Sequence, residues 1–121
     1  MNMKFSHVNI VVNNVIETRQ FYEKYFNMKC TIDIGEQFAS LRDSEGFLFN
    51  IMYGQRIDYP ENYHIGFIQD SEESVDLLYQ RLLKDGYNPG NPEFTHNSYT
   101  FFFKSPGDFY VEIYFDMSLK Q

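Results

Sequence analysis

SPGDFYVEIYF, residues 105–115, reads as a tight turn followed by a strand in which aromatic and β-branched residues surround one carboxylate, Glu112. Side chains alternate between the two faces of a strand, so Tyr110, Glu112 and Tyr114 share one face. An unpaired carboxylate is costly to bury. We therefore expect this face either to open to solvent or to meet a positively charged partner.

The sequence on the N-terminal side of this run indicates one order of elements twice over: a strand, a helix and three strands. In the first copy, Asn14 and Glu17 predict a capping-box start for a helix with an aromatic face. In the second copy, Asp70 or Ser71 begins the helix and Gly86 ends it. The expected strands lie near 5–12, 28–34, 37–43 and 46–53, and then near 64–68, 92–95, 98–104 and 109–115.

The two copies are related by nearly constant shifts along the chain. The shift that carries His7 to His64 also superposes the apolar faces of the two helices. A slightly longer shift, which carries Asn50 to Glu112, superposes the last strands. The sequence therefore predicts an α+β fold of two βαβββ modules in a single domain, 1–121. Module one spans about 1–56 and module two about 60–121, and the polar stretch 55–62 lies between them.

Composition and charge limit the classes of protein that this chain can be. A length of 121 residues fits one domain, and a net charge of −7 argues against a nucleic-acid or anionic-membrane partner. Aromatic residues reach 19%, so some rings are expected to line a pocket rather than the core. The single cysteine, Cys30, fits a reducing compartment, and no segment reads as a signal peptide or a membrane span. These features predict a cytoplasmic protein.

The repeat places four residues around a pseudo-twofold axis: His7, Asn50, His64 and Glu112. Three of them are metal-ligand types. Two neutral imidazoles and one carboxylate that leave part of the ion open suit a divalent transition metal, which would act as a Lewis acid on a bound oxygen. Such an ion would supply the positive charge that Glu112 needs.

Each candidate also has a structural interpretation. His7 could be a hydrogen-bonded core histidine, and His64 a residue at a strand edge. We interpret His96, beside Asn97 in a turn sequence, as a surface residue. Cys30, in a strand-like run, is read as a small buried apolar residue rather than a nucleophile.

Four stretches resemble the vicinal oxygen chelate superfamily, the relatives of glyoxalases, bleomycin-resistance proteins and extradiol dioxygenases. They are the first strand, the end of the first helix, the opening of module two and the closing run, at 7–12, 21–28, 64–67 and 105–113. The resemblance covers nearly the whole chain. It implies that the paired modules form a half-barrel cup, usually completed in a homodimer, with a divalent metal inside.

Carried over residue by residue, the family's metal positions fall on His7, His64 and Glu112, and the metal would be Mn, Fe, Ni, Co or Zn. Asn50 stands where glyoxalase I enzymes have a fourth ligand, usually Glu. This departure argues against a lactoylglutathione lyase, and three ligands look more like a thiol transferase or a small dioxygenase-like member.

The resemblance thus favours a metal-dependent enzyme that chelates two oxygens of a small substrate. Glu112 would take part in catalysis with Tyr110 or Tyr114 as proton donor. The side chains expected to line the substrate pocket are Asn9, Asn50, Met52 and Arg42.

Two other functions stay open at this point. One is a metal-free protein that sequesters a flat or basic drug, as bleomycin-resistance members do, which the acidic charge and the many rings would suit. The other is a degenerate member with a structural or regulatory role. A pure binder has no need of three metal ligands, so the intact triad separates the metal-dependent enzyme from the metal-free binder.

Overall fold

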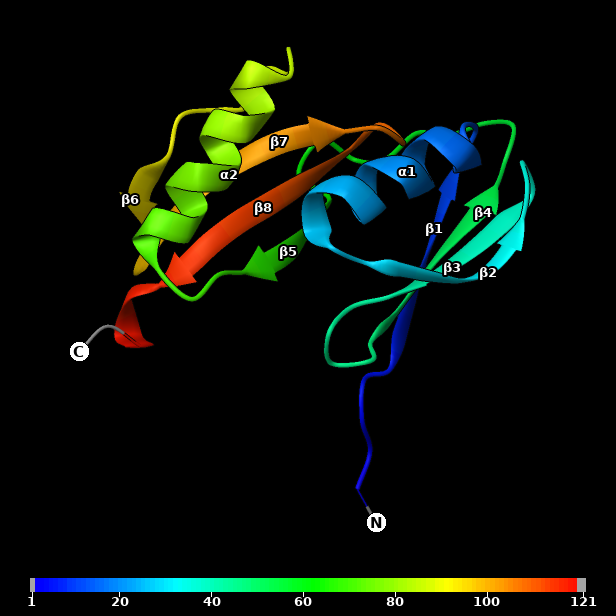
Figure 1. Cartoon of the computed structure of the whole chain (residues 1–121), viewed down its shortest axis with the longest axis horizontal. Helices are drawn as coiled ribbons and strands as arrows, with labels where there is room; N and C mark the ends of the chain where they lie inside the picture. The colour runs from blue at the N-terminus through cyan, green and yellow to red at the C-terminus, as the bar shows by residue number, and fades with distance from the viewer. Residues whose placement is uncertain (1, 120–121) are drawn as a thin grey trace. The chain divides into compact units, whose positions relative to one another are not determined.

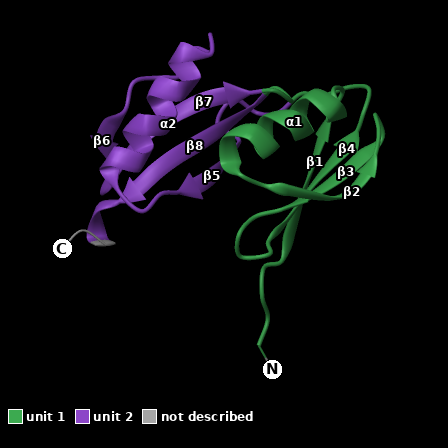
Figure 2. Cartoon of the chain, in the orientation of Figure 1, with its two compact units in different colours: residues 1–58, 106–108 green, residues 59–105, 109–121 purple. Residues whose placement is uncertain are grey.

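The computed structural model of the chain describes residues 2–119, which fold into two units of the same design (Figure 1). Unit one consists of residues 1–58 with 106–108, and unit two of 59–105 with 109–121 (Figure 2). The elements of unit one are β1 (His7–Val12), α1 (Val15–Phe26), β2 (Lys29–Ile34), β3 (Phe38–Arg42) and β4 (Leu48–Tyr53). Those of unit two are β5 (His64–Ile68), α2 (Glu72–Lys84), β6 (Glu93–Thr95), β7 (Ser98–Ser105) and β8 (Phe109–Asp116), followed by the short helix Met117–Leu119.

Unit one is a four-stranded sheet in the order β1-β4-β3-β2, with β1 parallel to β4 and the other pairs antiparallel. One face of the sheet is buried under α1, and alternate apolar residues of β1, β3 and β4 form it. Ile10, Leu41 and Phe49 belong to this buried face. The ring of Tyr22 on α1 meets that of Phe49 edge-on, with the centroids 5.0 Å apart.

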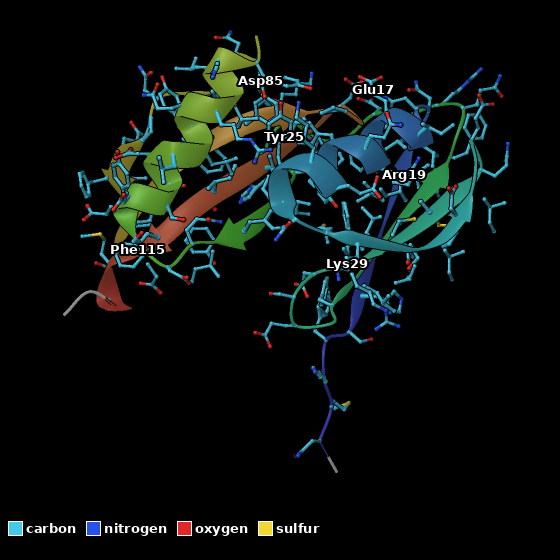
Figure 3. All side chains as sticks on the ribbon, viewed as in Figure 1. Glu17, Arg19, Tyr25, Lys29, Asp85 and Phe115 are labelled. Atoms are coloured by element: carbon cyan, nitrogen blue, oxygen red, sulfur yellow. The ribbon has the colours of Figure 1, made fainter. Side chains whose placement is uncertain are left out.

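Unit two repeats the arrangement, with the sheet order β5-β8-β7-β6 and β5 parallel to β8. The burial of β8 alternates along the whole strand, so Val111 and Ile113 lie in the core while Glu112 is half-buried on the other face. The ring of Tyr79 on α2 meets that of Phe101 edge-on, with the centroids 5.5 Å apart. Tyr25 of α1 and Phe115 of β8, both labelled in Figure 3, are buried in the same way within their own units.

The predicted order of elements is confirmed, and the fold is two βαβββ modules built from four-stranded sheets. The strand bounds differ from the predicted ones by no more than the usual uncertainty at element ends. A single domain stays a prediction. Among the described residues, no helix has the length and apolar character needed to cross a membrane.

The two helix starts differ from one another. Ser71 caps α2, because its hydroxyl accepts a hydrogen bond from the Ser74 N–H at 3.1 Å. Asn14 occupies the N-cap position of α1, but its side chain makes no such bond with the backbone. It donates instead to the Glu17 side chain at 3.2 Å and accepts from Thr18 Oγ1 at 3.2 Å. The predicted capping box is therefore wrong, because both polar groups of the Asn14 side chain bond to other side chains and not to the backbone.

Candidate metal centre

Each sheet has a face that its helix leaves uncovered, which we call the open face of that unit. Residues paired directly across neighbouring strands point to the same side of a sheet. In unit two the pairing therefore arranges the open face in three rows that cross β5, β8 and β7. The rows are His64, Tyr110 and Lys104; Gly66, Glu112 and Phe102; and Ile68, Tyr114 and Thr100.

His64 is held in a definite orientation at the start of β5. Its Nδ1 lies 3.1 Å from the carbonyl oxygen of Asn62. A carbonyl only accepts hydrogen bonds, so Nδ1 carries a proton, while Nε2 can present a lone pair to a metal or carry a second proton. Nε2 lies 3.5 Å from Glu112 Oε1. A backbone carbonyl that fixes the imidazole in this way is typical of histidines that bind metals.

Glu112 is held from the opposite side. Its Oε2 accepts a hydrogen bond from Thr100 Oγ1 at 2.8 Å, which leaves Oε1 directed at His64. The side chains of His64 and Glu112 are 40% and 22% exposed, so the pair is open to solvent on one side. Both parts of the expectation for this face are met, because it is open and Glu112 has a partner that can carry positive charge.

The pair fits a cation between its two groups. A carboxylate oxygen and an imidazole lone pair that face one another are both acceptors, and they repel unless a proton or a metal ion lies between them. The donor set of nitrogen and carboxylate oxygen suits Mn, Fe, Co, Ni or Zn. This arrangement can therefore hold part of the coordination shell of such an ion.

Tyr110 and Tyr114 flank Glu112 along β8 and are half-buried on the open face. Gly66 lies beside Glu112 on β5, and a methyl group at Gly66 would come within 3.3 Å of Tyr114 Cε1. The absence of a side chain at Gly66 thus gives the Tyr114 ring its place next to Glu112.

The open face of unit one has rows in the same register. Asn9, Asn50 and Ser40 form the central row, His7 and Arg42 lie in the row before it, and Met52 lies in the row after it. The Ser40 hydroxyl donates to Asn50 Oδ1 at 2.7 Å, and Asn50 Nδ2 donates to Asn9 Oδ1 at 2.8 Å. Four of the predicted site residues thus share this face with His7, and Ser40 orients two of them.

The structure brings together two of the three predicted ligands, His64 and Glu112. His7 lies in unit one, where it is exposed and its Nδ1 is 3.4 Å from the Ser6 hydroxyl. Over residues 2–119, no three His, Cys, Asp or Glu side chains gather in a group that could hold an ion. The role of all three as metal ligands stays a prediction.

Sequence reasoning missed Thr100 and Asn62. The alternation of 98–104 could have placed Thr100 on the same face as Glu112 once the length of the 106–108 turn was used to count pairs across the hairpin. Asn62 contributes only its backbone carbonyl, and no side-chain pattern marks such a contact. His96 is exposed at φ 49° in the turn before β7, as its surface interpretation predicts.

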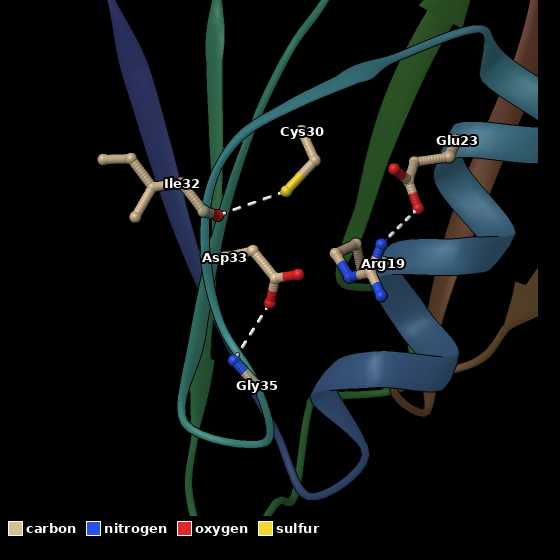
Figure 4. Close-up of polar contacts among 6 residues, drawn as sticks. All are labelled: Arg19, Glu23, Cys30, Ile32, Asp33 and Gly35. Carbon is tan, nitrogen blue, oxygen red and sulfur yellow. Dashed lines mark hydrogen bonds and ion pairs between the residues drawn. The ribbon is translucent and has the colours of Figure 1, made fainter.

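Cys30 belongs to β2, at the bulge near the start of the strand, and takes no part in this site (Figure 4). Its thiol donates to the Ile32 carbonyl at 3.2 Å, while Arg19 is paired with Glu23 at 2.7 Å on the facing helix. Burial raises the pKa of the Cys30 thiol, although the nearby Arg19 charge opposes the shift. A thiol with a raised pKa is a poor nucleophile near neutral pH, which agrees with that part of the prediction, but Cys30 is half-buried rather than buried.

Two βαβββ modules form the glyoxalase type of fold. In this chain the His64–Glu112 pair lies on the uncovered face of the second sheet. The chain belongs to the Glyoxalase/Bleomycin resistance protein/Dioxygenase superfamily, whose sequence model matches residues 4–113.

Three relatives illustrate the range of this superfamily. A structure described as a possible glyoxalase from Bacillus cereus is 41% identical, with a TM-score of 0.87 over 93% of this chain and 98% of that one. A mutant fosfomycin resistance protein from Listeria monocytogenes, complexed with Mn(II) and 1S,2S-dihydroxypropylphosphonic acid, is 20% identical, with a TM-score of 0.79 over 93% and 90% of the two chains.

The third relative is named "Probable trivalent organoarsenical cleaving enzyme" and comes from Bacillus subtilis. It is 30% identical over 86 residues, which are 70% of this chain. The match spans only 58% of the length of that relative.

Proposed function

We propose that this protein is an enzyme that depends on a divalent metal held by His7, His64 and Glu112. One observation carries the proposal: the Asn62 carbonyl and the Thr100 hydroxyl orient His64 and Glu112 so that Nε2 and Oε1 face each other at 3.5 Å. Two groups aimed at each other in this way are bridged by a proton or by a cation, and the bound divalent ion would take that place. The Mn(II) in the fosfomycin resistance relative supports a divalent ion of the Mn, Fe, Co, Ni and Zn group.

The bound ion would supply Lewis acidity to two oxygens of a small substrate. The residues of this chain would do the rest. Tyr110 and Tyr114 are the neighbours of Glu112 on the same face of β8. Either hydroxyl would donate a proton to the reacting group. Asn9, Asn50, Met52 and Arg42 would line the pocket that selects the substrate.

Asn50 narrows the class of reaction. It is the repeat partner of Glu112, and its amide is occupied by hydrogen bonds to Ser40 and Asn9. A neutral amide in this place gives three ligands rather than four, which favours thiol transfer or dioxygenase-like chemistry over the isomerisation of a glutathione adduct.

We do not propose that this chain cleaves organoarsenicals as the name of the Bacillus subtilis relative describes. Trivalent arsenic is soft and prefers thiolate ligands. This chain has one Cys, and the pKa of its thiol is raised by burial. A substrate held by two protein thiols would need a second Cys that the sequence lacks.

Metal content tests the proposal. Elemental analysis of protein purified without a His-tag or chelator should find close to one ion per chain in the parent and in His96→Ala, which removes an exposed histidine from a turn. The His7→Ala, His64→Ala double variant and Glu112→Gln should lose it. An absence of metal after reconstitution with Mn, Fe, Ni and Zn, or a full content in Glu112→Gln, would overturn the assignment.

A second candidate function is the binding of a flat or cationic drug without metal. Phe102 favours it, because this ring is 39% exposed on the open face and meets the His64 ring edge-on at 5.3 Å. An exposed ring on a protein of charge −7 suits a planar cation. Drug affinity that survives chelation would support this function, and affinity that vanishes with the metal would exclude it.

We also propose an oligomeric state and a compartment for this protein. The two units would form one domain, and the protein would act as a homodimer in the cytoplasm on a small molecule, without nucleic acid or membrane. Sedimentation equilibrium would test the dimer. The single thiol fits a reducing compartment, since no internal disulfide can form.

A further inference from the structure

Lys104 occupies a distinctive place on the open face of unit two. It pairs with Tyr110 on β8, which in turn pairs with His64 on β5, so the three side chains form one row on one face. Neighbouring strands lie about 4.8 Å apart, which places the backbones of His64 and Lys104 roughly 10 Å from each other. The long side chain of Lys104 can shorten this span. Lys104 therefore carries a positive charge within reach of a small molecule held beside His64 and Glu112.

Unit one has a cation in the same position. Arg42 pairs with Leu48 on β4, which pairs with His7 on β1. The shift along the chain that carries Asn50 to Glu112 also carries Arg42 to Lys104. Each unit thus has one row in which a histidine and a cation flank the last strand of the module. The repetition argues against a chance surface lysine.

The ammonium group of Lys104 is available to a ligand. The side chain is exposed, and it forms no ion pair with any residue of the described chain. Glu112, which lies diagonally across the strands from Lys104, is engaged by Thr100 and faces His64. The charge of Lys104 is therefore not neutralised by a partner within the described part of unit two.

Most of the other side chains on the open face around Lys104 are aromatic, aliphatic or acidic. They include Phe102, Tyr110 and Ile68, and the charged groups on β8 are Glu112 and Asp116. Lys104 is the only Lys or Arg among the residues of β5 to β8 on this face of the described sheet. A protein of charge −7 would repel an anion unless such a local charge received it.

We propose that Lys104 binds an oxyanion group of the substrate, so that the substrate class is a small molecule carrying a carboxylate, phosphonate or phosphate. This inference rests on the proposed function, since it takes the His64–Glu112 pair as the reacting centre. Lys104 is a specificity-determining residue in this scheme. Its ammonium group forms a charge-assisted hydrogen bond with the anion and holds the other end of the molecule toward the pair.

Calorimetric titration with acetate, methylphosphonate and inorganic phosphate at low salt tests the inference and separates the three anions. We expect the parent to bind at least one of them. Lys104→Gln should weaken that binding about tenfold, and Lys104→Arg should restore most of it, because the arginine keeps the charge-assisted hydrogen bond to the anion. Lys84→Gln is the matched control, because Lys84 is exposed in the last turn of α2 and its loss changes the net charge equally.

Equal weakening by Lys104→Gln and Lys84→Gln would overturn the inference, as would a parent that binds none of the three anions. Metal content measured on the same preparations separates this failure from that of the proposed function. If metal content depends on His64 and Glu112 but anion affinity is the same in the parent and in Lys104→Gln, the inference alone is refuted. Anion binding that depends on Lys104 in a protein without metal would refute the proposed function alone.

Discussion

Thr100 donates a hydrogen bond to Glu112 Oε2 at 2.8 Å from a position that is only 1% exposed. The two residues are diagonal neighbours on the β7–β8 ladder, because Thr100 pairs with Tyr114 and Glu112 pairs with Phe102. A buried hydroxyl therefore determines which oxygen of Glu112 is free. The orientation of the candidate metal ligand depends on a residue that would not itself touch the metal.

Thr100→Val should weaken metal binding about ten- to hundredfold, the usual effect of removing a hydrogen-bond partner of a ligand. Valine has nearly the same shape, so the core of unit two should be kept. Competition with a chelator would measure the affinity. Thr95→Val, the same change on β6, should leave it as in the parent, and an unchanged affinity in Thr100→Val would refute the orienting role.

Ser40→Ala should lower the free energy of unfolding by about 1 kcal/mol, because Asn50 Oδ1 loses the hydroxyl that donates to it at 2.7 Å. Urea denaturation would measure this change. The side-chain amide resonances of Asn50 and Asn9 should also shift, since the Asn50 amide is then held from one side only. Amide resonances identical to those of the parent would show that Ser40 does not orient them.

Ser71→Ala should destabilise the protein by about 1 kcal/mol, since the Ser74 N–H loses its cap at the start of α2. Chemical denaturation would again measure the effect. Ser44→Ala, in the exposed turn before β4, is the comparison and should change the stability by less than about 0.5 kcal/mol. Similar values for the two variants would contradict the cap.

The hydroxyl of Tyr99 should lose its proton at a higher pH than an ordinary tyrosine does. Its hydroxyl donates to Asp76 Oδ1 at 2.5 Å, and this hydrogen bond raises the pKa of Tyr99 from 10.0 to about 12. The unfolded state releases the Tyr99 proton first, so the stabilisation is complete below pH 10 and is lost as the pH rises from 10 towards 12. Folding stability of the parent and of Tyr99→Phe, compared across this range, should converge at the alkaline end. A constant difference would refute the shift.

Much of the fold could be predicted from local pattern. Period-2 alternation located the strands, helical spacing located α1 and α2, and the shifts from His7 to His64 and from Asn50 to Glu112 identified two modules of one design. The capping box at Asn14 failed because several hydrogen-bond partners are available there, and the Asn14 side chain bonds to the side chains of Glu17 and Thr18. Residue types at the right spacing do not reveal which of several donors wins.

For the candidate site too, the sequence indicated some features and the tertiary structure decided others. By itself the sequence determined which residues are the candidates for chemistry here, namely His7, His64 and Glu112, because imidazoles and an isolated strand carboxylate stand out against an apolar pattern and fall on repeat-related positions. Only the tertiary structure decided how two of them are aimed. Strand pairing sets Thr100 beside Glu112, and the chain entering β5 sets the Asn62 carbonyl against His64. Hydrogen-bond geometry depends on register and backbone path, which the order of residues along one strand does not contain.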